Sequence, residues 1–126
     1  MSVVLDASAV FALLWNEPGM DRVQAQLNGA IVSAVNIAEI YSKSSEKLQD
    51  LSATRQVLLN MPIFIRPFDE ASSLLTGQLR LPTRSQGLSL GDRACLATAI
   101  LEKRPVMTAD KAWRTLDLGI EIIVIR

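Results

Sequence analysis

The sequence predicts an α/β protein, a three-layer α/β/α sandwich around a central, mostly parallel sheet of about five strands. Short apolar runs alternate with helical stretches along the chain. Runs that lack polar alternation are typical of parallel strands that are buried on both faces. The chain has 126 residues, 49% hydrophobic and 21% charged, which suits one domain with a buried core. We therefore expect residues 1–126 to form a single domain.

Each element is predicted from a local pattern. The apolar runs predicted to be strands cover residues 3–5, 30–33, 63–65, 105–108 and 121–125. The stretches predicted to be helices cover residues 8–15, 20–28, 35–48, 52–60, 69–81, 90–103 and 111–117. The turn-forming residues 16–19 end the first helix, Gly29 ends the second, and Pro62 and Pro67 flank the third strand. Residues 82–89 are the clearest loop. Right-handed crossovers between these strands place helices on both faces of the sheet.

The composition excludes several kinds of catalytic site. The chain has no histidine, and Cys95 is its one cysteine. Neither a Ser-His-Asp or Cys-His centre nor a zinc site built from His and Cys can therefore form within it. An enzyme of this composition must use carboxylates, hydroxyls, Lys or Arg. Carboxylate and hydroxyl oxygens are hard ligands that suit magnesium or manganese.

Charge and hydropathy indicate where the protein acts. Residues 1–15 are apolar, but no basic segment precedes them and Asp6 interrupts them, and no run of about 18 apolar residues occurs. We expect a cytoplasmic protein with no membrane segment. Lys plus Arg and Asp plus Glu each number 13, so the formal net charge is zero. This balance disfavours a broad nucleic-acid footprint but allows a local basic rim around an acidic site.

Four acidic residues are expected at one edge of the predicted sheet. Asp6 directly follows the first strand, and Asp110 lies just past the fourth. Glu39 and Asp92 lie near the starts of two helices. A crossover helix runs antiparallel to its strands, so its N-terminus lies at their carboxyl ends. Open α/β sheets bind their ligands at this edge, where the strand order reverses.

These acids also have a structural interpretation. Asp6 and Asp110 fit helix N-caps, and residues 36–39 and 89–92 have the spacing of capping boxes. Two carboxylates about 4 Å apart, however, repel by about 4 kcal/mol at an effective dielectric constant near 20. The four acids therefore either lie apart and only cap helices, or share a divalent cation. Such a cation turns a bound water into a nucleophile and stabilises charge on a reacting phosphate.

The segments around the acids resemble motifs of the PIN-domain nucleases. They are residues 3–9 (VVLDASA), 36–40 (NIAEI), 90–94 (LGDRA) and 108–113 (TADKAW). Their order and spacing are similar to those of compact VapC-like toxins of toxin–antitoxin pairs, over essentially the whole chain. The resemblance implies a Mg²⁺- or Mn²⁺-dependent endoribonuclease with sheet order 3-2-1-4-5. It also implies an RNA substrate, a cognate antitoxin and a homodimer.

The resemblance further implies roles for individual residues. The catalytic, metal-binding carboxylates would be Asp6, Glu39, Asp92 and Asp110. Ser8 and Thr108 would supply hydroxyls that orient a carboxylate or a metal-bound water, although capping or packing explains these two hydroxyls equally well. A cationic rim for RNA would include Arg84, Arg93 and Lys111, with Arg80 and Arg114 near the same edge. Scattered solvated charges are the alternative interpretation of this rim.

Several other side chains are expected to be structural. Trp15 and Trp113 are interpreted as packing anchors rather than base-stacking platforms. Cys95 is expected to be a small buried residue of an alanine-rich helix. Lys43 lies one helical turn beyond Glu39, where it could contact a substrate phosphate or pair with Glu39, and we expect the ion pair.

Two other functions are compatible with parts of the pattern. A receiver-like signalling domain has a similar size and a five-stranded sheet, and Asp69 would then be its phosphoacceptor. The absence of an acidic pair after the first strand disfavours this function, as does the strand at the end of the chain. A catalytically inactive PIN-fold interaction module is the second alternative.

Overall fold

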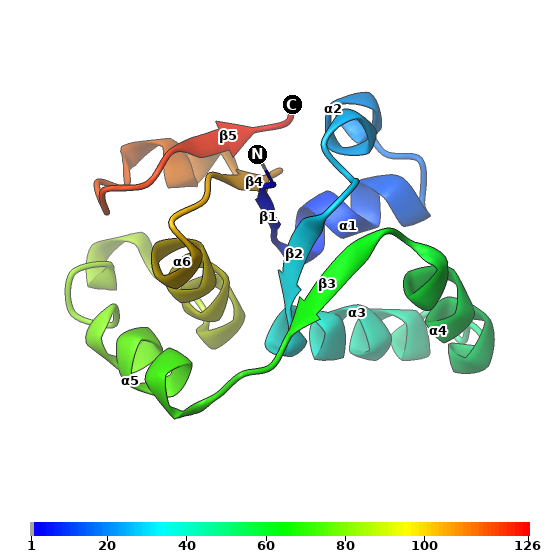
Figure 1. Cartoon of the computed structure of the whole chain (residues 1–126), viewed down its shortest axis with the longest axis horizontal. Coiled ribbons are helices and arrows are strands. Elements are labelled where there is room, and N and C mark those ends of the chain that lie inside the picture. The colour runs from blue at the N-terminus through cyan, green and yellow to red at the C-terminus, as the bar shows by residue number, and fades with distance from the viewer. Residues whose placement is uncertain (1) are drawn as a thin grey trace.

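The computed structural model describes residues 2–126 and contains a five-stranded sheet with helices on both faces (Figure 1). The strands are β1 (Val4–Leu5), β2 (Ala30–Ser33), β3 (Ile63–Arg66), β4 (Val106–Thr108) and β5 (Ile122–Val124). Their order is β3-β2-β1-β4-β5, and every neighbouring pair is parallel. The predicted fold class and the sheet order implied by the resemblance are therefore both confirmed.

Helices occupy the predicted intervals between the strands. The α-helices are α1 (Ala7–Leu14), α2 (Met20–Ala25), α3 (Ala34–Glu46), α4 (Leu51–Asn60), α5 (Glu70–Gln78) and α6 (Leu90–Glu102). Two short 3₁₀ helices are η1 (Arg84–Gln86), within the predicted loop, and η2 (Lys111–Thr115). The largest boundary differences are at α2 and α5, which each end three residues before the predicted end. Within residues 2–126, no helix combines the length and apolar character needed to cross a membrane.

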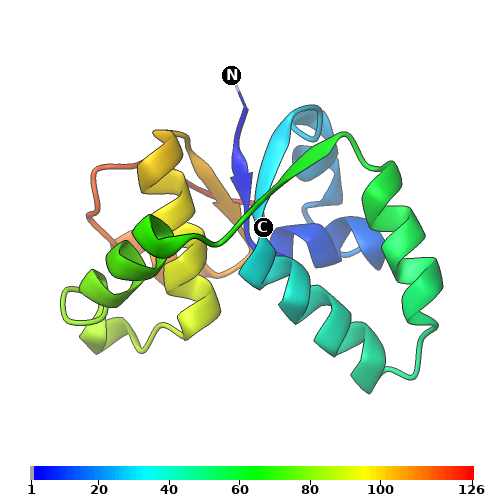
Figure 2. The same ribbon diagram turned by 60° about the horizontal axis from the view of Figure 1, so that its bottom comes forward.

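Two hydrophobic cores lie on opposite faces of the sheet. One core packs α1, α2, α3 and α4 against the sheet, around buried residues such as Val10, Ile40 and Leu58. The other lies under α5, α6 and η2 and contains Leu96 and Trp113. Figure 2 shows α5 and α6 on one side of the strands and the first four helices on the other. The molecule is thus the three-layer sandwich that the alternating pattern predicts.

Most of the buried residues of α6 are small. Ala94, Cys95, Ala97 and Ala99 are all fully buried. Small side chains allow the helix axis to approach the sheet closely. Trp113 is only 1% exposed, so its interpretation as a packing anchor is confirmed, and so is the burial of Cys95.

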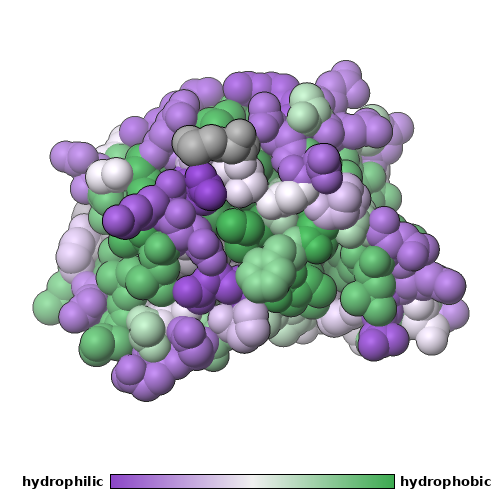
Figure 3. All heavy atoms as spheres, in the orientation of Figure 1, coloured by the Kyte–Doolittle hydropathy of each residue, from purple (hydrophilic) through white to green (hydrophobic). Residues whose placement is uncertain are grey.

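The β3 edge of the sheet is less well covered. Figure 3, in the orientation of Figure 1, shows apolar residues at the molecular surface over β2 and β3. Phe64 on β3 is 54% exposed. Because β3 pairs only with β2, this strand is an edge of the sheet.

The strand order also decides between the two folds considered from sequence. A receiver domain has the order 2-1-3-4-5, in which the third strand lies at the centre. Here β3 is an edge strand, and Asp69 follows it far from the switch between β1 and β4. The Asp69 side chain accepts a hydrogen bond from the Ser72 N–H at 2.9 Å and caps α5. The receiver-like interpretation is therefore wrong.

Candidate active site

The sheet register brings the ends of β1 and β4 together. Leu5 pairs with Met107 across these two strands. The residues that follow, Asp6 and Thr108, are consequently neighbours although they lie far apart in the sequence. Thr108 Oγ1 donates a hydrogen bond of 2.6 Å to Asp6 Oδ2. This contact lies at the carboxyl end of the sheet, where β1 and β4 meet.

Asp6 is the most deeply buried of the four predicted acids, with 6% of its surface exposed. Its Oδ1 accepts hydrogen bonds from Ser8 Oγ at 2.6 Å and from the Ala9 N–H at 2.8 Å. Together with the bond from Thr108, three donors occupy three of its about four acceptor positions. The carboxylate therefore has a fixed orientation and retains capacity for one further ligand.

Burial raises the pKa of Asp6 to about 6, above its ordinary value of 3.8. The hydrogen bonds from Ser8, Thr108 and Ala9 lower this pKa, and the charge of Asp92 raises it slightly. Desolvation is the largest effect because an ionised carboxylate loses most of its hydration here. A cation next to Asp6 would stabilise the ionised form and offset that cost.

The two hydroxyls that hold Asp6 are themselves held by the backbone after β4. The Ala109 N–H donates to Ser8 Oγ at 2.8 Å, and the Asp110 N–H donates to Thr108 Oγ1 at 3.1 Å. Each hydroxyl thus accepts from the backbone and donates to Asp6. Ser8 and Thr108 therefore fix the orientation of the Asp6 carboxylate.

Glu39 approaches the start of α6. Asn36 Nδ2 donates to Glu39 Oε1 at 2.7 Å and to the Gly91 carbonyl at 3.1 Å. A Cβ atom at Gly91 would collide with the Glu39 carboxyl group. Asn36 and Gly91 therefore position Glu39 between α3 and α6. The capping box expected at residues 36–39 is wrong, because Ser33 caps α3 and its Oγ accepts from the Val35 N–H.

Asp92 and Asp110 both serve as helix caps. Asp92 forms a capping box with Ser89, in which Asp92 Oδ2 accepts from the Ser89 N–H at 3.0 Å. Asp110 is exposed, and its Oδ1 accepts from the Ala112 N–H at 2.9 Å. Each cap occupies one of about four acceptor positions of its carboxylate. Capping is therefore compatible with a second role for both residues.

Three of the four acids raise the pKa of the same buried group, the Cys95 thiol on α6. Burial raises the pKa of the Cys95 thiol well above its usual range, and the charges of Asp6, Asp92 and Glu39 raise this pKa further. Yet no three acidic or cysteine side chains in the described part of the chain are close enough to hold one ion together. Magnesium commonly uses one or two carboxylates and keeps several waters. The donors present fit such a hydrated ion, and Asp6 is the most firmly oriented of these carboxylates.

The cations predicted to contact substrate differ in solvent exposure and in the bonds that they already make. Arg84 and Lys111 are exposed. Arg93 is half-buried, and its Nη1 donates to the Thr76 carbonyl at 3.0 Å, which joins α6 to α5. The predicted pair between Lys43 and Glu39 is wrong: Lys43 Nζ lies 3.7 Å from Glu46, which is three residues further along the exposed side of α3.

Sequence reasoning missed the positioning roles of Asn36 and Gly91. Asn36 lies three residues before Glu39 and therefore on the same side of α3. Gly91 is the second residue of α6, where glycine is an unfavourable helix former. A glycine at such a position indicates a close approach by another group, and this signal could have identified the contact with Glu39.

Two hollows flank α1. The first, which we call the α1–α3 groove, lies between α1, α3 and the start of α6 and has a volume of about 620 Å³. Ala7, Glu39 and Gly91 line it, so it opens directly beside the acidic edge. Its other lining residues include Phe11, Lys43 and Leu90.

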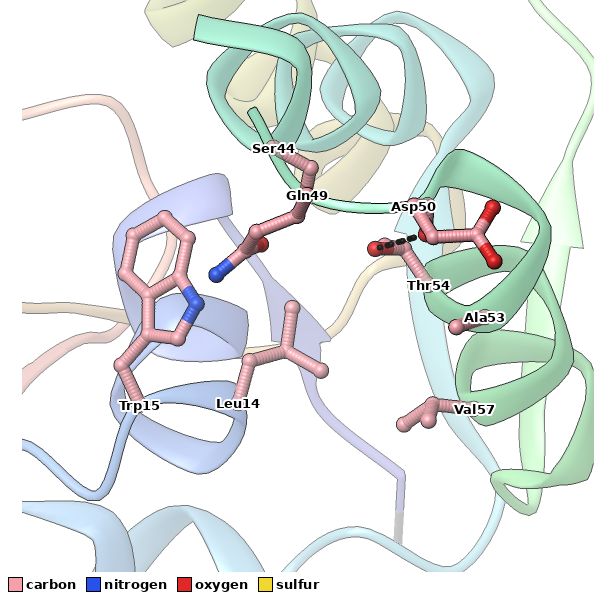
Figure 4. A pocket seen from close by; sticks show the side chains of 8 residues that line it. All are labelled: Leu14, Trp15, Ser44, Gln49, Asp50, Ala53, Thr54 and Val57. Atoms are coloured by element: carbon pink, nitrogen blue, oxygen red, sulfur yellow. Dashed lines mark hydrogen bonds between the residues drawn. The ribbon is translucent and has the colours of Figure 1, made fainter. Parts of the chain in front are cut away.

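The second hollow lies between the ends of α1 and α3 and the start of α4, with a volume of about 310 Å³ (Figure 4). Trp15 stands on one side of it, opposite Val57 and Ala53 on α4. Asp50 accepts from the Ser52 N–H at 3.0 Å and so caps α4. Thr54 Oγ1 donates to the Asp50 carbonyl. The acid in this hollow therefore maintains a helix end.

A family model for the PIN domain matches residues 3–118. The chain therefore belongs to the PIN-domain family, and the match includes all four predicted acids. A comparison with curated proteins finds no match.

Solved structures of toxin–antitoxin proteins share this fold. VapC20 of Mycobacterium tuberculosis, described as a sarcin–ricin loop cleaving toxin, has a TM-score of 0.77 at 12% identity, covering 95% of this chain and 99% of that one. A toxin–antitoxin complex from Klebsiella pneumoniae has a TM-score of 0.74 at 20% identity, covering 91% and 92%. VapBC2 of Rickettsia felis, bound to a promoter DNA fragment, has a TM-score of 0.73 at 18% identity, covering 97% of both chains.

Proposed function

We propose that this PIN-domain protein is a Mg²⁺- or Mn²⁺-dependent endoribonuclease and the toxin of a toxin–antitoxin pair. The observation that carries the proposal is the buried Asp6 carboxylate, oriented by Ser8 and Thr108 where β1 meets β4. A buried carboxylate whose pKa is raised by desolvation is typical of a functional site. Membership of the PIN family supports hydrolysis of phosphodiester bonds.

In this proposal each of the four carboxylates has a different role. Asp6 binds the ion, with Ser8 and Thr108 fixing which of its lone pairs faces outward. Glu39 and Asp92 hold water molecules or the ion from the α3 and α6 sides, and Asp110 adds negative charge at the open rim. A bound divalent ion supplies a more acidic water and offsets charge on the phosphate.

Substrate contacts are proposed for the exposed cations near the edge. Arg84 and Lys111 have solvated side chains that can reach phosphate groups without losing a structural bond. Arg93 already donates to the Thr76 carbonyl. We therefore propose that it contributes positive charge near the substrate rather than a full bidentate contact.

The proposed partners follow from the structural neighbours. Several of those are toxin–antitoxin complexes, and one is named as a toxin that cleaves the sarcin–ricin loop. We propose by analogy an RNA substrate, a cognate antitoxin and a homodimer for this chain. A cytoplasmic location, where RNA and antitoxin would meet the toxin, belongs to the same proposal, as does the action of residues 1–126 as one domain.

The test is RNA cleavage by the purified chain. A mixed-sequence RNA is incubated with Mg²⁺, with Mn²⁺ or with EDTA, beside the variants Asp6→Asn and Asp92→Asn. We expect cleavage only with a divalent ion, and its loss in both variants. Cleavage that survives EDTA, or that persists in both variants, would sink the proposal.

The alternative is a catalytically inactive PIN-fold interaction module. It is favoured by the capping roles of Asp92 and Asp110, which explain both carboxylates without a metal. No cleavage under any ionic condition, together with retained binding of a partner protein, would support this alternative.

A further inference from the structure

The α1–α3 groove is continuous with the acidic edge. Ala7, which directly follows Asp6, lines the same groove as Glu39. A polymer whose phosphate lies at Asp6 therefore has an open path along α3. With a volume of about 620 Å³, this path is large enough for a nucleotide unit.

Phe11 presents an aromatic surface in this groove. It lies four residues, or roughly 6 Å of helix, from Ala7. Phe11 therefore lies about one helical turn from the residue that follows Asp6. Leu90, at the start of α6, lines the groove as well and is 57% exposed.

Phe11 is the end of a preformed stack. Its ring lies parallel to Trp15, with an interplanar angle of 5° and centroids 4.6 Å apart. The Lys47 ammonium lies 4.3 Å from the Trp15 ring centroid. Trp15 borders the second hollow (Figure 4), whereas Phe11 borders the groove. The stack with Trp15 and the packing of Phe11 against the core restrain its ring, so little rotamer freedom would be lost when a flat partner binds.

Three charged residues, Glu39, Lys43 and Glu46, line the groove, and Lys43 is the one that a phosphate would contact. Glu39 marks the end that a metal-bound phosphate would occupy, and Lys43 lies one helical turn further on. Lys43 and Glu46 are paired at 3.7 Å, with 51% and 70% of their side chains exposed. Such an exposed pair is weak, so a phosphate can compete for the ammonium. The apolar part of the groove, around Phe11, Val35 and Ala38, suits a base.

We propose that the α1–α3 groove binds the nucleobase next to the scissile phosphate of a single-stranded RNA, stacked on Phe11. The proposal rests on the proposed nuclease function and deepens it. Single-stranded nucleic acids are commonly bound through bases that stack on aromatic side chains. Phe11 then favours unpaired RNA, because a base inside a duplex must first unpair and unstack to reach the ring, which costs free energy.

The test compares Phe11→Leu with Phe11→Tyr. Leucine keeps most of the apolar volume that packs against the core but removes the flat ring, whereas tyrosine keeps the ring. On a short, unpaired RNA of mixed sequence we expect Phe11→Leu to lower kcat/KM about tenfold, chiefly through KM. Phe11→Tyr should retain near wild-type kcat/KM. Thermal unfolding of each variant records any general loss of stability.

Phe64→Leu is the matched control, because Phe64 is half-exposed but lies on β3, outside the groove. It should leave cleavage unchanged. Binding is measured separately, by fluorescence anisotropy of a labelled RNA in the Asp6→Asn background, where Phe11→Leu should weaken affinity by a similar factor.

Three outcomes would overturn the groove proposal. In the first, Phe11→Leu is folded and cleaves and binds RNA like the wild type. In the second, Phe64→Leu shows the same loss. In the third, Phe11→Leu weakens the capture of a partner protein but not of RNA, which assigns the groove to protein docking. A wild-type chain that cleaves no RNA with either metal would overturn the nuclease function itself, and the groove proposal with it.

Discussion

The carboxyl group of Glu39 lies in the space that a side chain at Gly91 would occupy. Asn36 Nδ2 holds this arrangement by donating to both Glu39 Oε1 and the Gly91 carbonyl. A glycine, an amide and a carboxylate from two helices thus form one unit. Because Glu39 is a proposed ligand or water-holding group, this unit links helix packing to the proposed chemistry.

The first prediction concerns Gly91→Ala. A Cβ at this position collides with the end of the Glu39 side chain, which is flexible and can turn away. We expect cleavage to fall by about 10²-fold, as misplacement by about 1 Å commonly causes, with only a small change in the free energy of unfolding. RNA cleavage rates and urea unfolding measure the two effects. The control is Gly77→Ala on α5, where nothing meets the added Cβ, so alanine should stabilise by about 0.5–1 kcal/mol.

The double mutant Gly91→Ala/Glu39→Ala shows how much of the Gly91→Ala effect is due to the collision with Glu39. In a Glu39→Ala background the Gly91→Ala change meets no carboxylate and should stabilise like Gly77→Ala. If Gly91→Ala destabilises equally with and without Glu39, the contact between the two residues is not the cause.

The second prediction concerns Asn36→Ala. The change removes a hydrogen bond to a carboxylate and another to a backbone carbonyl, which should cost about 1–3 kcal/mol of unfolding free energy. It should also raise the metal concentration needed for half-maximal cleavage, because Glu39 loses its orientation. Asn36→Asp, which keeps the shape but lacks the donor and adds a charge next to Glu39, should be at least as harmful. Metal titrations of cleavage that match the wild type in both variants would contradict the positioning role.

The third prediction concerns pH and Asp6. Its pKa is about 6 in the folded protein against 3.8 for an ordinary aspartate, so between these values the folded state holds more protons than the unfolded state. The stability of the metal-free protein should therefore fall as pH rises through this window, by about 3 kcal/mol in total. Urea unfolding in EDTA at pH 4 and pH 7 measures this difference. Asp6→Asn should reduce it, whereas stability that rises across the window would contradict the burial argument.

The same shift predicts the pH dependence of cleavage. A protonated Asp6 binds a cation poorly, so activity at limiting metal should fall as pH drops below about 6. Saturating metal should move this limit to lower pH, because the ion competes with the proton. The comparison of pH profiles at two metal concentrations tests this.

Much of this structure was accessible from sequence because the elements are locally encoded. The apolar runs that became β1 to β5 lack alternation, and parallel burial requires that pattern. The placement of Asp6 and Asp110 at one edge followed from the direction of parallel strands alone. Sheet order did not follow from local patterns, and it rested on the family resemblance.

The two errors concern the residues around Glu39 on α3. Lys43 pairs with Glu46 and not with Glu39, because Asn36 holds the Glu39 carboxyl group beside the start of α6. Residues 36–39 matched a capping box, but α3 begins at Ala34 and that register places Asn36 inside the helix. The pairing of Lys43 depends on where α6 packs, because α6 decides what holds Glu39. The start of α3 is instead set by the local cap of Ser33, which competes with the capping pattern at residues 36–39.

The last prediction concerns metal binding without substrate. A cation at Asp6 offsets the desolvation of its carboxylate and the repulsion from Asp92, and it binds the folded state in preference to the unfolded chain. Mg²⁺ or Mn²⁺ should therefore raise the Tm, with a gain in stability of about 2.7 kcal/mol at a hundredfold excess over Kd. Asp6→Asn should abolish most of this gain, whereas Asp69→Asn, which alters the cap of α5 and its pairing with Arg66, should retain it. Differential scanning calorimetry with and without EDTA makes the comparison, and an equal gain in both variants would place the ion elsewhere.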